Sequence, residues 1–154
     1  MAAYFFDSSA LAKRHVREIG TAWVIGLMRD SATERIYVAR ITSVEVTSAL
    51  ARRQRGNTIS SAEAGKALTR FRRLYQNRYF KIDITNRLIE RAESLAEKHF
   101  LRGYDAVQLV AALETNDRRL AINAAPLILI SADAALNSAA VAEGLSVDDP
   151  NLHP

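Results

Sequence analysis

The 154-residue sequence contains no cysteine, which excludes a disulfide framework and a zinc site built from thiolates. It also lacks any run that approaches the roughly 18 consecutive apolar residues of a membrane span. The short apolar stretch at residues 2–6 has no basic segment before it and is shorter than the ~7–15-residue core of a signal peptide. We therefore expect a soluble, cytoplasmic protein with no membrane partner.

Motifs that mark several common enzyme classes are missing as well. The chain has neither the glycine-rich loop of P-loop nucleotide hydrolases nor that of dinucleotide-binding folds, and it has no G-x-S-x-G nucleophile elbow. A phosphatase with an aspartyl nucleophile usually carries D-x-D after its first strand, whereas Ser9 stands where the second aspartate would be. The three histidines are widely separated, so nothing predicts the imidazole pair of an acid–base nuclease.

What the sequence does contain is typical of a globular protein with a substantial core. Hydrophobic residues make up 49% and charged residues 25%, which argues against extensive disorder. The length suits one domain, and no linker, repeat or low-complexity segment divides it. We expect a single domain over residues 1–147, followed by a tail, residues 148–154, that frays.

Strand-like and helix-like segments alternate along the chain. Short β-branched or aromatic segments predict strands at residues 4–6, 36–41, 80–84, 127–130 and 145–147. Helical patterns lie between and after them, at residues 8–17, 21–29, 42–54, 60–76, 86–99, 104–113 and 132–143. This alternation predicts an α/β fold in which a mostly parallel central sheet is flanked by helices on both faces, as a three-layer sandwich.

Four acidic residues stand where such a fold places its reactive crevice, at the carboxyl ends of the strands. Asp7 follows the first strand, Glu45 lies in the first turn after the second, and Asp133 follows the apolar strand at residues 127–130. Asp105 heads the most apolar helix, directly after a tight L-R-G-Y turn. We therefore expect these four carboxylates to share one edge of the sheet.

Each of these acids has a simpler explanation when it is taken alone. All four lie near helix N-termini, where a carboxylate accepts free N–H groups and complements the helix dipole. Capping does not explain why four of them would meet, since converging carboxylates repel one another unless a cation lies among them. Hard divalent ions such as Mg²⁺ or Mn²⁺ prefer oxygen ligands of this kind, and they support hydrolysis of phosphoryl groups.

The positive charge is small overall and unevenly distributed. The net charge is +4 and the pI about 9.7, and the arginines gather at residues 52–55 and 70–78. We interpret each cluster first as a solvated helix face, with contacts to nucleic-acid phosphates as the alternative.

Four blocks of the sequence resemble those of a known family. The blocks F-D-S-S-A-L-A-K, T-S-V-E, L-R-G-Y-D-A-V-Q-L and I-L-I-S-A-D-A-A-L, in this order, are similar to those of PIN-domain ribonucleases, in particular the VapC-type toxins of toxin–antitoxin pairs. The resemblance implies that Asp7, Glu45 and Asp105 form a metal site, with Asp133 as the fourth acid and Ser131 in support. It also implies Mg²⁺- or Mn²⁺-dependent endoribonuclease activity, products with a 5′-phosphate and a 3′-hydroxyl, a homodimer, and a partner antitoxin.

The roles of Ser8, Ser9 and Gln108, and the function of the protein, each have an alternative interpretation. Ser8 and Ser9 are expected to cap the first helix, the alternative being that they orient Asp7 or contact a substrate phosphate. Gln108 lies one turn beyond Asp105, so it either reaches the site or makes a buried hydrogen bond. A non-catalytic RNA- or protein-binding module on the same fold, or a DNA nuclease, is the alternative to an endoribonuclease.

Overall fold

The elements of the fold follow the predicted alternation closely. We describe a computed structural model of the chain at residues 1–29 and 34–154. The strands are β1 (Ala3–Phe6), β2 (Arg35–Ala39), β3 (Phe80–Ile82), β4 (Ile128–Ile130) and β5 (Ser146–Asp148). The helices are α1 (Ser8–Ala12), α2 (Thr21–Leu27), α3 (Thr42–Arg55), α4 (Ser61–Asn77), α5 (Asn86–His99), α6 (Gly103–Ala121) and α7 (Ala134–Ala142), and a 3-10 turn follows at Pro150–Leu152.

The strands form one five-stranded sheet in the order β3-β2-β1-β4-β5. Every neighbouring pair is parallel, with Phe5 opposite Tyr37 on one side and Leu129 on the other. The first strand of the chain therefore occupies the middle of the sheet, and the carboxyl ends of all five strands meet at one edge. The predicted parallel sheet is confirmed.

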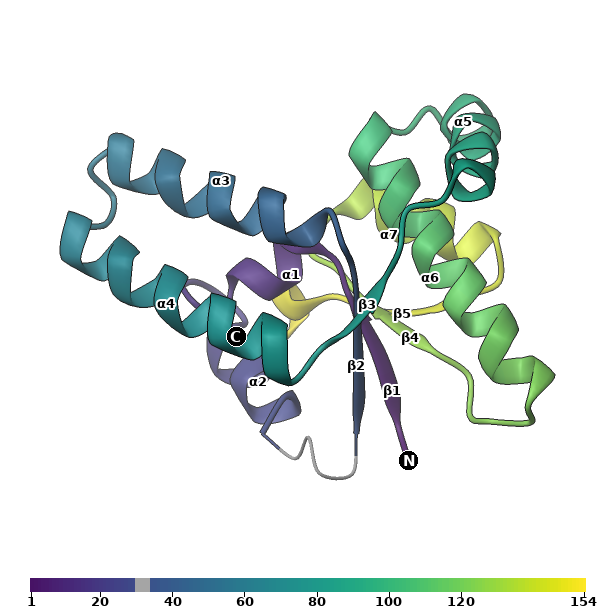
Figure 1. Ribbon diagram of the computed structural model, residues 1–154, viewed down its shortest axis with the longest axis horizontal. Coiled ribbons are helices and arrows are strands. Elements are labelled where there is room, and N and C mark those ends of the chain that lie inside the picture. The colour runs from purple at the N-terminus through teal and green to yellow at the C-terminus, as the bar shows by residue number, and fades with distance from the viewer. Residues whose placement is uncertain (30–33) are drawn as a thin grey trace.

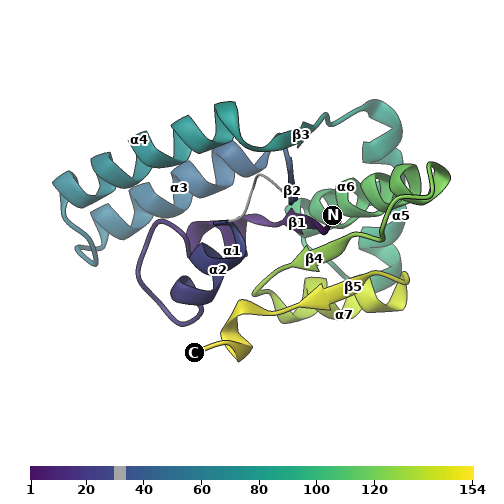
Figure 2. The same cartoon turned by 90° about the horizontal axis from the view of Figure 1, so that it is seen from below.

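Two hydrophobic cores lie on opposite faces of this sheet, because successive side chains of a strand point to opposite sides. Phe5 and Leu129 pack with the apolar faces of α5, α6 and α7. Their neighbours Phe6 and Ile130 pack on the other face with residues from α1 to α4. Figures 1 and 2 show these two groups of helices on either side of the strands, so the predicted three-layer sandwich is also confirmed.

Two helices differ in length from the sequence-based expectation. The first ends at Ala12 rather than at Arg17, because the chain turns after Lys13 and carries Val16 into the core of α1 to α4. The helix expected at residues 104–113 runs on to Ala121. Its second half keeps one buried face, with Thr115 and Arg119, and that amphipathic continuation is why it does not stop at the end of the apolar run.

The longest helix on the face covered by α1 to α4 begins at a capping box. The Ser60 side chain accepts the Glu63 backbone N–H, and the Glu63 carboxylate accepts the Ser60 backbone N–H. Helix α4 then runs antiparallel to α3, and the two form a hairpin that projects beyond the sheet (Figure 1). This hairpin forms one wall of the cavities described below.

The segment after Asp148, where we expect a fraying tail, makes several contacts with the rest of the domain. Pro150 is buried against Gly20. Gly20 has a φ of +84°, a conformation that glycine adopts readily. A Cβ atom at position 20 would lie 2.3 Å from the Pro150 carbonyl oxygen, so only glycine fits against Pro150. The ring of His153 stacks on that of Trp23, with centroids 4.0 Å apart, and its Nε2 lies 2.7 Å from an Asp148 carboxylate oxygen. These contacts bind the last residues to α2.

None of the helices in the described part of the chain is long and apolar enough to cross a membrane.

Candidate active site

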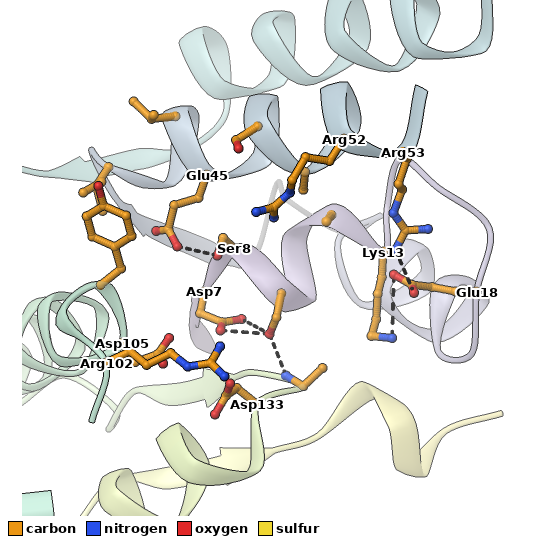
Figure 3. A pocket seen from close by; sticks show the side chains of 18 residues that line it. Asp7, Ser8, Lys13, Glu18, Glu45, Arg52, Arg53, Arg102, Asp105 and Asp133 are labelled. Carbon is orange, nitrogen blue, oxygen red and sulfur yellow. Dashed lines mark hydrogen bonds and ion pairs between the residues drawn. The ribbon is translucent and has the colours of Figure 1, made fainter. Parts of the chain in front are cut away.

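The four predicted carboxylates lie together at the carboxyl edge of the sheet. Asp7 directly follows β1, Glu45 and Asp105 lie in the first turns of α3 and α6, and Asp133 is the N-cap of α7. All four line one cavity of about 560 Å³. Figure 3 shows Glu45 above, Asp105 and Asp133 below, and Asp7 between them. Elements from distant parts of the sequence thus bring four acids to one place.

Asp7 is the most deeply buried of the four, with 2% of its surface exposed. It is the N-cap of α1, since its Oδ1 accepts the Ala10 backbone N–H at 2.9 Å. The expectation that Ser8 and Ser9 cap this helix is therefore wrong. Ser9 instead orients Asp7, because its hydroxyl lies 2.7 and 2.8 Å from the two carboxylate oxygens. Burial raises the pKa of Asp7 to about 7, although these hydrogen bonds oppose the shift.

Ser131 connects Asp7 with Asp133. Its hydroxyl donates to Asp7 Oδ2 at 3.1 Å and accepts the Asp133 backbone N–H at the same distance. The residue is fully buried at the end of β4, next to β1 in the sheet. Ser131 therefore fixes the relative positions of two of the acids, as a supporting residue would.

Glu45 is held at both of its carboxylate oxygens. Ser8 Oγ donates to Oε2 at 2.9 Å, and Gln108 Nε2 donates to Oε1 at 2.7 Å. The same Gln108 nitrogen lies 2.9 Å from Thr42 Oγ1, and the Gln108 side chain is 1% exposed. Both alternatives considered for Gln108 thus apply, because its buried hydrogen bond is made to a residue of the site.

Asp105 and Asp133 are more exposed and interact through their charges. Partial burial raises the pKa of Asp105, and the nearby charges of Asp133 and Glu45 raise it further, whereas Arg102 lowers it. One oxygen of Asp133 accepts the Leu136 backbone N–H at 2.9 Å and so caps α7. The charges of Asp133 and Glu45 thus disfavour ionisation of Asp105, an effect that a bound cation would relieve.

The donor set suits a hard divalent cation, since it consists of carboxylate oxygens with hydroxyls behind them. Within residues 1–29 and 34–154, however, no three acidic or histidine side chains are grouped closely enough to hold one ion together. Mg²⁺ and Mn²⁺ both prefer oxygen ligands, so the chemical type of these donors fits either ion. Their present spacing requires side-chain adjustment before three of them could bind the same ion.

Basic side chains border the same cavity, and two of them belong to the arginine cluster predicted at residues 52–55. Arg52 and Arg53 on α3 and Lys13 after α1 line it together with Glu18. Glu18 pairs with Arg53 at 3.1 Å and lies 3.8 Å from Lys13 Nζ. Figure 3 shows these charges at the end of the cavity away from Asp105. The seven-residue spacing of Glu45 and Arg52, two helical turns, was the available signal that both lie on one face of α3.

A third component of the cavity wall is apolar and lies beside Asp105. Tyr104 is 61% exposed and Val44 65%, and both line the cavity together with Ile41. An exposed aromatic ring next to a cluster of carboxylates gives a nucleobase a surface on which to stack. The lining of the cavity thus combines four acids, several cations and one exposed aromatic side chain.

A sequence model of the PIN domain family matches residues 4–142, which include all four acids. The chain belongs to the PIN domain family. Domains of this family are generally nucleases. No curated protein matches the sequence.

Solved structures share the PIN fold of this chain at low sequence identity. PAE2754 from Pyrobaculum aerophilum has a TM-score of 0.64 at 17% identity, covering 98% of this chain and 91% of its own. VapBC2 from Rickettsia felis, solved with a DNA fragment from its promoter, has a TM-score of 0.58 at 12% identity, covering 96% and 98%. FitAcB from Neisseria gonorrhoeae has a TM-score of 0.57 at 15% identity, covering 96% and 97%.

Proposed function

We propose that this PIN domain is a metal-dependent endoribonuclease that acts as the toxin of a type II toxin–antitoxin pair. The observation that carries the proposal is the meeting of Asp7, Glu45, Asp105 and Asp133 in one cavity at the carboxyl edge of the sheet. Capping explains single acids at helix N-termini, but not four acids gathered in one cavity, where the charges of Asp133 and Glu45 raise the pKa of Asp105. The matched family adds independent support, because its domains are generally nucleases.

The four carboxylates would hold Mg²⁺ or Mn²⁺, with Ser8, Ser131 and Gln108 behind them. When bound, the metal would supply activation of water and neutralisation of charge on the phosphoryl oxygens. The chain's own residues prepare the site for it. Ser9 and Ser131 keep Asp7 turned toward the cavity, and Ser8 with Gln108 fixes both oxygens of Glu45.

The remaining walls are suited to a single strand of RNA. Arg52 and Arg102 line the cavity on either side of the acids and would hold the phosphates that flank the scissile bond (Figure 3). Tyr104 would stack against a base, which single-stranded RNA can turn outward. Attack by water in line with the leaving oxygen would give a 5′-phosphate and a 3′-hydroxyl.

The biological role is proposed from the structural neighbours. These neighbours are VapBC2 and FitAcB, and a further one is FitAB, solved, like VapBC2, with a DNA fragment. We infer that this chain likewise pairs with an antitoxin protein, and that it forms a homodimer. Coexpression with the product of the neighbouring small reading frame, followed by size-exclusion chromatography with light scattering, tests both assignments; a monomer that binds no such product would contradict them.

The proposed activity predicts that Asp105→Asn abolishes RNA cleavage. Losing one carboxylate of the site removes a ligand, so the rate with Mn²⁺ should fall by at least about a hundredfold. The measurement is cleavage of single-stranded RNA and DNA oligonucleotides with Mn²⁺ and with EDTA, alongside circular dichroism to establish folding. Asp117→Asn is the matched control, because Asp117 lies on the same helix but pairs with Arg91 outside the cavity.

Three outcomes would contradict the proposal. Cleavage that survives Asp105→Asn would place the chemistry elsewhere. Cleavage of DNA alone would make the protein a DNA nuclease. Binding of RNA that is unaffected by EDTA, without any cleavage by the wild type, would identify a non-catalytic binding module.

A further inference from the structure

A second cavity, of about 480 Å³, lies between the turn after α1 and the α3–α4 hairpin. Its charged lining is almost entirely cationic: Arg17, Arg53, Lys66 and Arg70 face one acid, Glu63. The Glu63 carboxylate is already engaged, since it accepts the Ser60 backbone N–H at 2.7 Å in the capping box. No ion pair within 4 Å involves Arg17, Lys66 or Arg70 in the part of the chain that the structure describes.

The inner wall of this cavity contains a buried histidine without a hydrogen-bond partner. His15 is 9% exposed, its ring packs edge-on against Phe71, and neither ring nitrogen has a partner among the described residues. A buried N–H donor without a partner is unfavourable, so a ligand that accepts its hydrogen bond would be favoured.

The protonation of His15 is consistent with a donor role. Burial, together with the charges of Arg14 and Arg70, lowers the pKa of His15 to about 4. The ring is therefore neutral at pH 7 and offers one N–H donor without adding to the repulsion among the arginines. Unpaired N–H donors surrounded by cations are the groups that recognise an oxyanion.

We propose that this cavity is a phosphate-binding site, with His15 on its inner wall and Lys66 and Arg70 at its mouth. Three features carry this assignment: the excess of cations, the buried and unpaired nitrogens, and the single acid that is already engaged. A phosphate oxygen can accept several charged hydrogen bonds at once, so one group would satisfy donors from both walls.

The phosphate belongs to the RNA strand that occupies the candidate active site. This assignment of the phosphate to RNA rests on the proposed function. Arg53 lines both cavities, and its pairing with Glu18 places it where the two meet. A strand cut at the four acids and continuing past Arg52 and Arg53 would reach Lys66 and Arg70. The cavity would then hold a backbone phosphate at a distance from the scissile bond and fix the direction of the strand.

The site itself is tested without RNA and without activity. Inorganic phosphate, and separately pyrophosphate, is titrated into metal-free protein while the His15 ring nitrogens are followed by two-dimensional ¹H–¹⁵N NMR. Saturable shifts are expected, with binding about tenfold weaker in Lys66→Gln and in Arg70→Gln. Arg72→Gln, which removes the same charge from the same helix outside the cavity, should leave binding unchanged. Absence of saturable shifts at 50 mM, or equal weakening by Arg72→Gln, would overturn the site.

The source of the phosphate is tested by the salt dependence of RNA binding in the Asp105→Asn background. Loss of one phosphate contact on a single strand lowers the slope of log K against log salt by about 0.7. Arg70→Gln should show this decrease and Arg72→Gln should not. An unchanged slope in Arg70→Gln, with phosphate binding intact in the wild type, would assign the site to a free phosphate compound and overturn the RNA step. Failure of wild-type cleavage would instead overturn the proposed function and leave the phosphate titration standing.

Discussion

At the scale of single residues, Asp7 performs two tasks that are usually separate. It caps a helix, which favours the ionised carboxylate, and it is buried in the sheet edge, which favours the protonated form. Burial has the larger effect, so the pKa of Asp7 is raised to about 7. Without metal, the side chain therefore holds its proton up to near-neutral pH.

This shift predicts an unusual pH dependence of stability in metal-free protein. Between pH 4 and pH 7 the folded chain keeps a proton on Asp7 that the unfolded chain has lost, so raising the pH favours unfolding. Relative to Asp7→Asn, which cannot ionise, the wild type should lose about 4 kcal/mol of unfolding free energy over this range and no more above it. Urea unfolding in EDTA at pH 4 to 8 measures the difference.

The comparison with Asp7→Asn serves as its own control, because every other titrating group is common to both proteins. A difference that stays constant with pH would contradict the raised pKa. A wild type that gains stability relative to the variant as the pH rises would show that the hydrogen bonds of Ser9 and Ser131 outweigh burial.

At the scale of secondary-structure elements, the site depends on contacts between α3 and α6. Helix α6 supplies Gln108, which reaches Glu45 on α3 across 63 residues of sequence. The Gln108 side chain is buried, and its hydrogen bonds join the two helices on opposite faces of the sheet at the edge where the acids meet. Side chains of this kind keep metal ligands in a fixed orientation.

We expect Gln108→Leu, a change of similar volume, to weaken Mn²⁺ binding by about tenfold, because Glu45 loses the donor that fixes one of its oxygens. The measurement is Mn²⁺ titration followed by electron paramagnetic resonance, with melting temperature recorded in parallel. Gln54→Leu, at an exposed position of α3, provides the control. Unchanged Mn²⁺ affinity in a folded Gln108→Leu protein would limit this residue to a packing role.

The order of elements could be predicted from the sequence because it depends on local patterns. Short apolar segments alternate with amphipathic ones, and this alternation predicts the parallel sheet and places the four acids at its edge. The early end of α1 at Ala12 could not be predicted, since it is decided by the burial of Val16 against other helices. The hydrogen bond from Ser131 to Asp7 joins residues 124 positions apart, for which the sequence carries no local signal.

At the scale of the whole molecule, the last residues connect the end of the chain to its beginning. The buried Pro150 and the stacked ring of His153 hold the C-terminal segment on Gly20 and Trp23. Asn151 also lies 3.4 Å from the Ala132 carbonyl oxygen, next to Asp133. The C-terminal segment therefore spans from α2 to the edge of the candidate active site.

Trp23 is the one tryptophan of the sequence, so its fluorescence reports this connection. We expect His153→Ala to shift the Trp23 emission to longer wavelength, because removal of the stacked ring exposes the indole to water. His99→Ala, which removes a histidine paired with Glu143, should leave the emission unchanged. Identical spectra for wild type and His153→Ala would show that the C-terminal segment does not cover Trp23 in solution.

The sheet order also determines when, during synthesis, the candidate active site can exist. The ribosome makes β1 first, yet this strand takes the middle of the sheet and needs β4 on one side, and Asp7 needs Ser131 from the residue after β4. A nascent chain therefore carries Asp7 and Glu45 for most of its elongation without Asp133 beside them. Any product that ends before residue 128 leaves one edge of β1 unpaired, which favours aggregation or degradation. Catalytic competence would arise only after β4 and Asp133 have been synthesised.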